Sequence, residues 1–264
     1  MNLGLEGRKA LVTGSTAGIG FATAQALARE GAHVVVNGRT DARVRAAMDR
    51  IRASVGSALV DGVAADLGTA DGCAAVIAHT PQVDVLVNNM GIFEPKAFDA
   101  ISDADWMRFF EANVLSGVRM ARHYVRAMRE RNWGRIVFVS SESALQIPVE
   151  MIHYGMTKTA QLAIARGLAE SLGGTGVTVN CVLPGPTSSE GVGQFVSQLA
   201  RAQGTDVATV ERNFFAMARP SSIIRRFASP DEVAALIAYV CSSQASATTG
   251  AALRVDGGVV RAIA

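Results

Sequence analysis

The sequence has little charge, few cysteines and no long apolar run. Charged side chains make up 18% of the 264 residues, and 25 Lys and Arg against 23 Asp and Glu leave a net charge of +2. So low a charged fraction is not typical of a disordered chain. A nearly neutral chain also lacks the excess of cations with which nucleic-acid binders neutralise phosphates. We therefore expect no nucleic-acid partner.

Signals for a membrane, a secretory route or a metal are also missing. No stretch of 18 consecutive apolar residues occurs, and residues 1–9 show no basic segment followed by an apolar one. The sequence therefore predicts neither a transmembrane helix nor a secretory signal, and we expect no membrane association. Cys73, Cys181 and Cys241 lack the spacing of a disulfide framework or a metal site. We expect them to be buried in a cytoplasmic protein that binds no metal.

Glycine and apolar residues, by contrast, are abundant. The chain holds 26 glycines and 49% hydrophobic residues, and short apolar runs alternate with stretches of helical spacing. The pattern predicts strands at 9–13, 33–37, 58–64, 84–88, 135–140, 177–182 and 253–255, and helices at 19–30, 41–54, 69–79, 103–131, 154–172 and 230–241. Strands that are apolar throughout are typical of a parallel sheet covered on both faces. We therefore expect a single α/β domain, residues 1–264, with a Rossmann-type doubly wound parallel sheet of about seven strands flanked by helices.

One segment, residues 188–226, breaks this alternation. It lacks a strand pattern and carries Phe195, Phe214, Phe215 and Met217. Such a segment is typical of a helical lid over a substrate site. The alternative is an extra pair of packed helices with no role in the site.

The first strand-to-helix turn has the pattern of a dinucleotide site. Residues 13–20 read TGSTAGIG. Gly14 allows a sharp turn, Gly18 lets backbone approach a pyrophosphate, and Gly20 lets the helix pack close to the strand. The free N–H groups at the helix start then face the phosphate. The predicted cofactor contacts here are Gly14, Ser15, Thr16, Gly18, Ile19 and Gly20.

The next strand ends supply further cofactor contacts. An NAD site usually has an acidic residue after the second strand, whereas this chain has Asn37-Gly38-Arg39. The guanidinium of Arg39 suits a 2′-phosphate, which favours NADP(H) over NAD(H). The alternative is that Arg39 is only a solvated loop residue. Further contacts are expected from Asp66 and Leu67 after the third strand, with the carboxylate accepting from the adenine amino group, and from Asn88 and Gly91 after the fourth.

A second group of residues suggests acid–base chemistry. Tyr154 and Lys158 lie four apart on one predicted helix and so face the same way. A nearby ammonium favours the phenolate and lowers the pKa of the phenol from its ordinary value of about 10. Ser141 ends the fifth strand shortly before this helix, and Asn113 lies in the long helix preceding it.

With these motifs in their order, the chain resembles the short-chain dehydrogenase/reductase family over essentially its whole length. The resemblance is carried by TGSTAGIG at 13–20, NNMG at 88–91, Asn113, Ser141, YGMTK at 154–158, Pro184-Gly185 and VDGG at 255–258. Two departures are visible. Met90 stands where the family usually has Ala, and Ser189 stands where Thr is common.

The resemblance implies a role for each catalytic candidate. Tyr154 would be the general acid or base on the carbonyl or alcohol oxygen, and Ser141 would hydrogen-bond that oxygen. Lys158 would lower the pKa of the tyrosine and hold the nicotinamide ribose. Asn113 would position a water in the proton relay. The remaining implied cofactor contacts, beside the nicotinamide, are Pro184, Gly185 and Ser189, together with Tyr154 and Lys158.

The function expected from this resemblance is NADPH-driven reduction of an apolar ketone or a 3-oxoacyl thioester, similar to the 3-oxoacyl carrier-protein reductases. The apolar preference is inferred from Phe93, Phe195, Phe214, Phe215, Met90, Ile92 and Met151. One alternative is an NAD-dependent dehydrogenase that oxidises a secondary alcohol. Another is a non-catalytic NADP-binding regulatory protein. The resemblance also implies a homotetramer.

Overall fold

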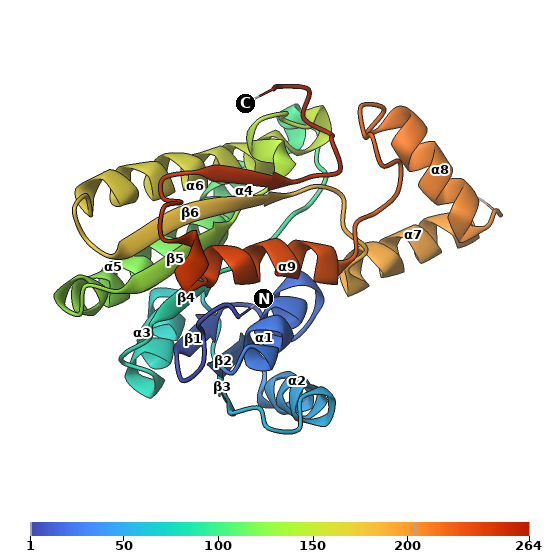
Figure 1. Ribbon diagram of the computed structural model, residues 1–264. Helices are drawn as coiled ribbons and strands as arrows, with labels where there is room; N and C mark the ends of the chain where they lie inside the picture. Colours follow the sequence, from blue (N-terminus) through green and yellow to red (C-terminus); the bar gives the residue numbers. More distant parts are fainter. Residues whose placement is uncertain (1, 203, 264) are drawn as a thin grey trace.

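Seven parallel strands form the central sheet, in the order β3-β2-β1-β4-β5-β6-β7 (Figure 1). The computed structural model describes residues 2–202 and 204–263, without the side chains of residues 191, 194, 195 and 199. The strands are β1 Lys9–Val12, β2 His33–Gly38, β3 Val60–Ala64, β4 Val85–Asn88, β5 Gly134–Val139, β6 Val177–Pro184 and β7 Ala252–Val255. The strand order reverses between β1 and β4, and open α/β sheets bind ligands at such a reversal.

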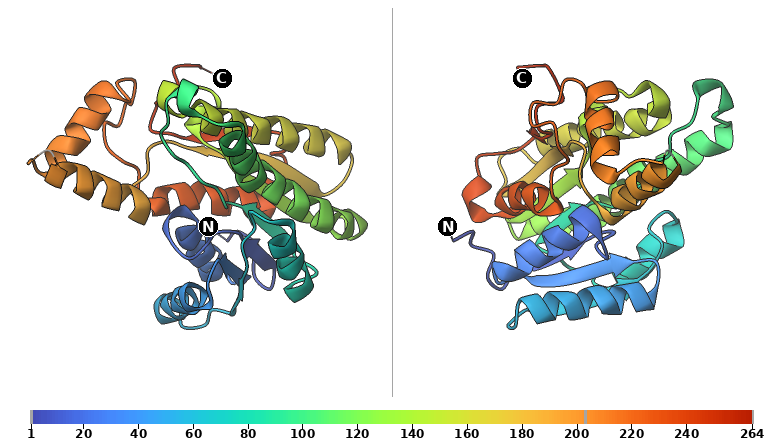
Figure 2. Two further views of the ribbon diagram at one scale, coloured as in Figure 1. Left: turned by 180° about the vertical axis from the view of Figure 1, so that it is seen from behind. Right: turned by 90° about the vertical axis from the view of Figure 1, so that its right-hand side faces the viewer.

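Helices cover both faces of the sheet, as the apolar strands predict (Figures 1 and 2). Side chains of α1, α2 and α9 pack in the apolar cluster on one face, and those of α3, α5 and α6 pack in the cluster on the other. The helices are α1 Gly18–Arg29, α2 Asp41–Ser54, α3 Ala70–His79, α4 Asp103–Phe110, α5 Ser116–Glu130, α6 Ile152–Ser171, α7 Glu190–Ala202, α8 Val207–Met217 and α9 Pro230–Cys241. The predicted fold class is therefore confirmed.

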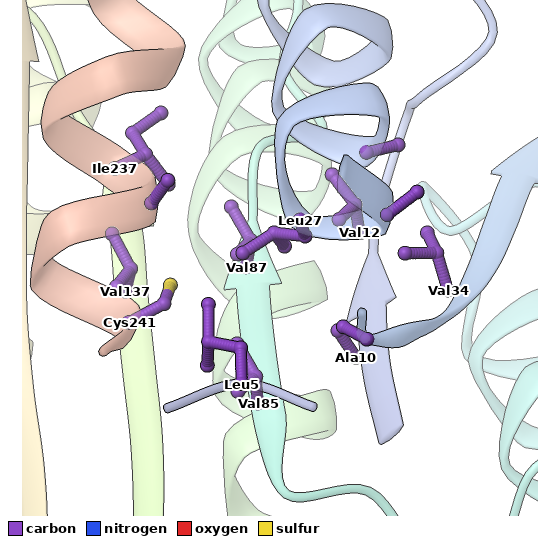
Figure 3. Close-up of a cluster of buried hydrophobic side chains, with 14 of the residues drawn as sticks. Leu5, Ala10, Val12, Leu27, Val34, Val85, Val87, Val137, Ile237 and Cys241 are labelled. Atoms are coloured by element: carbon purple, nitrogen blue, oxygen red, sulfur yellow. The ribbon is translucent and has the colours of Figure 1, made fainter. Parts of the chain in front are cut away.

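Successive residues of each strand contribute to opposite cores. On β2, Val34 and Val36 join the cluster with α1 and α9, whereas Val35 joins the cluster with α5 and α6. Figure 3 shows the first of these clusters, in which Leu27 of α1 and Ile237 of α9 pack over the central strands. Full burial of one such aliphatic side chain contributes about 1.5–3 kcal/mol, so the two faces together hold the strand ends, and the loops after them, in place.

The long helix expected at 103–131 is interrupted. Its chain starts at a capping box made by Ser102 and Asp105, then passes through a π-helical turn, Glu111–Leu115, before continuing as α5. Such single π-turns inside α-helices often occur at functional sites. This one contains Asn113, so the irregularity lies at a predicted catalytic residue.

The segment 188–226 contains two helices, α7 and α8, which project away from the sheet (Figures 1 and 2). They pack on each other through Val196, Ala200 and Val210. The ring of Phe215 is buried and packs against Phe214 and Phe227, so it belongs to the interior of the segment, not to a substrate surface.

The expected side-chain role of Phe195 lies outside the described residues. Within residues 2–202 and 204–263, no helix combines the length and apolar character needed to cross a membrane.

Candidate active site

The glycine-rich turn between β1 and α1 is open to a ligand. Gly14 and Gly18 adopt φ angles of 58° and 55°, which favour glycine. A Cβ on Gly20 would lie 2.5 Å from the carbonyl oxygen of Gly14 and would also overlap the side chain of Asn89, so only glycine fits there. Helix α1 begins after Ala17 without a side-chain cap, which leaves its first N–H groups available to an anion.

Four polar side chains fix this turn by hydrogen bonds to its backbone and to the neighbouring strands. Asn37 accepts from the Gly14 N–H at 3.1 Å and donates to the carbonyl oxygens of Val63, in β3, and Ala65, directly after it. Asn89 donates to the carbonyl oxygens of Thr13 and Gly14 at 2.9 and 3.0 Å. Thr13 accepts from the Asn89 N–H, and Ser15 donates to Val12. Thr13, Asn37 and Asn89 were not predicted from the sequence to be parts of the site. The usable signal is that each of them is a polar residue at, or directly after, the end of an apolar strand.

Several side chains that were predicted to contact the cofactor are instead packed or hydrogen-bonded within the fold. Ser15 is fully buried and bonded to β1 and β2, and Leu67 lies in the apolar core. Ile19 is partly buried against the other core cluster, and Thr16 fills the space beside Gly38. Any contact that Ser15 or Leu67 makes with a ligand would come from the backbone.

The other predicted contacts lie at the same edge. Arg39 is exposed directly after β2. Asp66 is exposed after β3, where it accepts from the Gly68 N–H at 2.9 Å. Asn88 is buried at the end of β4, and neither of its amide atoms has a hydrogen-bond partner among the described residues.

These features fit a dinucleotide. The uncapped helix start, the turn that tolerates no side chain and the unpaired Asn88 amide together form a polar cradle along the carboxyl edge of β1, β2 and β4. Buried polar atoms without partners carry a free-energy cost that a bound polar ligand would remove.

The four predicted catalytic residues converge beyond this cradle. The Lys158 ammonium lies 5.6 Å from the centre of the Tyr154 ring and donates to the Val139 carbonyl at 2.9 Å. Gly91 leaves room between them and Asn113, because a Cβ there would lie 3.3 Å from Asn113 Oδ1 and 3.5 Å from Lys158 Nζ. Ser141 follows β5 and is 6% exposed.

Asn113 joins three elements of the site. Its amide accepts from the Ile92 N–H at 2.7 Å and donates to the Ile92 carbonyl and to Thr157 Oγ1, both at 3.0 Å. Its backbone carbonyl accepts from Gln161 Nε2 at 2.6 Å. Asn113 thus fixes the loop after β4 against α6. Gln161 was missed by the sequence analysis, although a glutamine among apolar residues of a helix is a usable signal.

The pKa values of Tyr154 and Lys158 differ from those of the free side chains. Burial raises the pKa of the Tyr154 phenol, and the negative charge of Glu142 raises it further. Hydrogen bonding with Ser141 and the positive charge of Arg219 lower it. Burial lowers the pKa of Lys158 to about 8. The phenol is therefore a protonated acid at neutral pH in this structure, and the expected lowering of its pKa by Lys158 stays a prediction.

Comparison with known proteins shows which family the chain belongs to. A family model described as enoyl-(acyl carrier protein) reductase matches residues 14–260. The chain belongs to the short-chain dehydrogenase/reductase family. It is 46% identical to the uncharacterized oxidoreductase YvaG of Bacillus subtilis, over all of both chains. It is 31% identical to the 3-oxoacyl-[acyl-carrier-protein] reductase FabG of Aquifex aeolicus, over 98% of this chain and 100% of the relative.

Solved structures of this family agree with the fold. The L-sorbose reductase of Gluconobacter frateurii, complexed with NADPH and L-sorbose, superposes with a TM-score of 0.93 at 31% identity, covering 100% of both chains. The chain is thus a short-chain oxidoreductase of the same architecture, including the described part of the segment 188–226.

The two departures from the family pattern have physical explanations. Met90 packs in the core cluster beside α3 and α5, and its backbone lies below Gly14, so its bulk is accommodated on the cofactor side. Ser189 lies beside Gly18, and its Oγ accepts from the Val192 N–H at 3.4 Å at the start of α7. Pro184 ends β6, and Gly185 contacts the backbone of Asp256 so closely that a Cβ would overlap it. These contacts bring the start of the segment 188–226 to the cofactor cradle.

Proposed function

We propose that this short-chain oxidoreductase is an NADPH-dependent carbonyl reductase. The observation that carries the proposal is the convergence of Asn113, Ser141, Tyr154 and Lys158 beside the glycine-rich cradle. The dinucleotide, when bound, supplies the hydride for the carbonyl carbon. It would be held by the glycine turn, by Arg39, by Lys158 and by the residues after β6.

The chain's own residues handle the proton. Tyr154, whose phenol is protonated at neutral pH, donates a proton to the carbonyl oxygen as negative charge develops there. Ser141 hydrogen-bonds the same oxygen and so stabilises that charge. Asn113 holds the loop after β4, and Lys158 supplies a cation next to the phenol. Oxidation of a secondary alcohol is the reverse of these steps, with Tyr154 as the base.

The preference for NADPH rests on Arg39. Its exposed guanidinium follows β2, and no carboxylate stands at Asn37 or Gly38 to bind a ribose hydroxyl. The Asn37 amide is turned into the fold, where it holds the Gly14 N–H. Charge-assisted hydrogen bonds to a phosphate contribute about 1.5–3 kcal/mol each. We expect Arg39→Ala to weaken NADPH binding about 10- to 150-fold while leaving NADH binding unchanged, measured by fluorescence titration.

A matched control for that experiment is Arg29→Ala. Arg29 is exposed at the far end of α1, where it donates to Gln25. This substitution removes the same charge from the chain without touching the carboxyl edge of the sheet. Tighter or equal binding of NADH by the unmodified protein contradicts the assignment of Arg39.

An apolar ketone or a 3-oxoacyl thioester is the proposed substrate class. The ring of Phe93 lies edge-on to Tyr154 with centroids 6.5 Å apart, and Phe93 itself is 56% exposed. Leu145, Ile147 and Val149, in the loop between Ser141 and Tyr154, are also exposed. These side chains form an apolar surface beside the acid. The similarity to a 3-oxoacyl carrier-protein reductase supports the thioester.

A hydroxylated ketone is the second candidate. The ion pair of Arg219 with Glu142 places polar groups beside the same serine. The similarity to an L-sorbose reductase supports this class. Turnover of acetoacetyl thioesters, hydrophobic ketones and ketoses with NADPH decides between the two classes, since the apolar proposal fails if only ketoses react.

The catalytic proposal is tested by Tyr154→Phe. Removal of the only proton-donating atom of this side chain should lower kcat by about 10²–10⁴-fold, with little change in NADPH affinity. Tyr239→Phe is a control, because Tyr239 is a partly exposed tyrosine of α9 on the opposite face. Full activity of Tyr154→Phe across the panel refutes the mechanism. NADPH binding by the unmodified protein without turnover of any ketone in the panel would favour a regulatory role.

We also propose a homotetramer. Helix α6 carries incompletely buried apolar residues, Ala160, Leu162, Ala163 and Leu168, which a second copy of the chain would cover. Size-exclusion chromatography with light scattering tests this: a mass near 27.6 kDa indicates a monomer, and four times that mass is expected.

A further inference from the structure

The segment after α8 returns to the sheet and places a cation beside the catalytic serine. Arg219, two residues beyond α8, donates from Nε to Glu142 Oε1 at 3.1 Å. Its Nη1 donates to the Ala218 carbonyl at 2.8 Å and to Glu150 Oε1 at 3.4 Å. The side chains of Arg219 and Glu142 are only 10% and 6% exposed. This is a buried ion pair between the segment 188–226 and the loop that carries Ser141.

The second oxygen of Glu142 faces the serine. Ser141 Oγ donates to Glu142 Oε2 at 2.5 Å and accepts from the Ser143 N–H at 3.1 Å. The contacts therefore run in one line, from Arg219 through Glu142 to Ser141. A buried carboxylate is stable only when donors surround it, and both donors of this line are needed for that.

The line determines where the serine proton points. A hydroxyl has one proton to donate and two lone pairs to accept with. In this structure the proton of Ser141 points to Glu142 and its oxygen accepts from the Ser143 N–H, so Glu142 holds the hydroxyl until a substrate oxygen competes for the same proton.

We propose that Glu142 is a positioning residue that orients the Ser141 hydroxyl, and that Arg219 couples this orientation to the packing of the segment 188–226 on the site. The inference rests on the proposed function and deepens it. When the segment packs down, Arg219 neutralises Glu142 and holds it against Ser141. When the segment moves away, Glu142 is left without its cation and the serine loses its fixed partner.

Charges around Tyr154 make the inference measurable. The groups that face Tyr154 are Ser141 and Glu142 after β5, Arg219 after α8, Phe93 after β4 and Lys158 on its own helix. The negative charge of Glu142 raises the pKa of Tyr154, and the positive charge of Arg219 lowers it. Neutralising Glu142 should therefore lower the pKa of Tyr154, and neutralising Arg219 should raise it.

The experiment compares Glu142→Gln with Arg219→Gln. Ionisation of Tyr154 is followed by tyrosinate absorbance without substrate, with Tyr154→Phe subtracted to remove Tyr124 and Tyr239. Glu142→Gln should shift the titration to lower pH and Arg219→Gln to higher pH. In ketone reduction the alkaline limb of the kcat profile should move the same way, because the acid must be protonated. We expect kcat to fall about tenfold for Glu142→Gln.

Two controls separate positioning from damage to the fold. Arg219→Lys keeps the charge and should restore most of the wild-type profile. Glu150→Gln removes the more exposed partner of Arg219 and should change the titration and kcat less than twofold. Hydrogen exchange of α7 and α8 should increase several-fold in Glu142→Gln and Arg219→Gln but not in Glu150→Gln.

The outcomes are distinct from those for the proposed function. Shifts of the same sign, or no shift, in the two Gln variants overturn this inference, even if Tyr154→Phe abolishes turnover. Opposite shifts in a protein that reduces no carbonyl would support the contact line and refute the proposed function instead.

Discussion

His153 is buried with no hydrogen-bond partner in the described part of the chain, which predicts a specific loss of stability in acid. It precedes Tyr154 on α6 and has 0% exposure. Its ring lies 4.0 Å from the centre of the Phe109 ring and 6.0 Å from that of Trp106. Neither ring nitrogen contacts a donor or acceptor among the described residues. The histidine thus sits in an aromatic box that suits only its neutral form.

The sign of the effect follows from linkage. Burial lowers the pKa of His153, although the charges of Asp105 and Glu94 oppose this. In the unfolded chain its pKa returns to about 6.5. Below that pH His153 is protonated in the unfolded state but stays neutral in the folded state. The free energy of unfolding therefore decreases as the pH falls towards the folded-state pKa. The maximum slope is about 1.4 kcal/mol per pH unit, and above about pH 7 the effect disappears.

The assay is the free energy of unfolding in urea between pH 5 and pH 8. His153→Phe keeps an aromatic ring in the box and should flatten the curve below about pH 6.5, whatever packing change it causes at pH 8. His123→Phe is the control, because His123 is exposed and bonds the Pro81 carbonyl. If the acid slope of His153→Phe equals that of the wild type, His153 is not the buried neutral group described here.

The remaining predictions concern the cradle and the helix termini. Gly20→Ala should lower stability by about 1–3 kcal/mol and abolish measurable NADPH binding, because its Cβ overlaps the Gly14 carbonyl. Gly167→Ala, on α6 with open space beside it, should instead stabilise by about 0.5–1 kcal/mol, and a loss there refutes the space argument. Ser229→Ala removes the capping box with Glu232 at the start of α9 and should cost about 1 kcal/mol in urea unfolding.

Most of the fold was predictable because its signals are local. The helix expected at 230–241 matches α9, since Ser229 and Pro230 mark its start directly. The helix expected at 41–54 likewise matches α2. The sheet could be predicted as parallel because residues of both parities along each strand are apolar, and this pattern serves two cores at once.

The interruption at Glu111–Leu115 could not be predicted, because its cause is not local. Apolar spacing continues through it, and nothing in the spacing indicates a wider turn. The turn instead accompanies hydrogen bonds from Asn113 to the loop after β4 and to α6, 21 and 44 residues away in the chain. Long-range bonds of this kind also explain why Asn37 and Asn89 were missed.

Some contacts of the catalytic residues follow from local spacing, and others depend on distant parts of the chain. Tyr154 and Lys158 lie on one helix, so their spacing alone places them together. The partner of Ser141, in contrast, is its own neighbour Glu142, and the cation that holds Glu142 comes from 77 residues further on. The residues 188–226 stand outside the sheet, so no strand register constrains them. In the proposed coupling, the orientation of Ser141 therefore depends on the part of the sequence whose pattern is least informative. Arg219 is the residue of that part that contacts Glu142, the hydrogen-bond partner of Ser141.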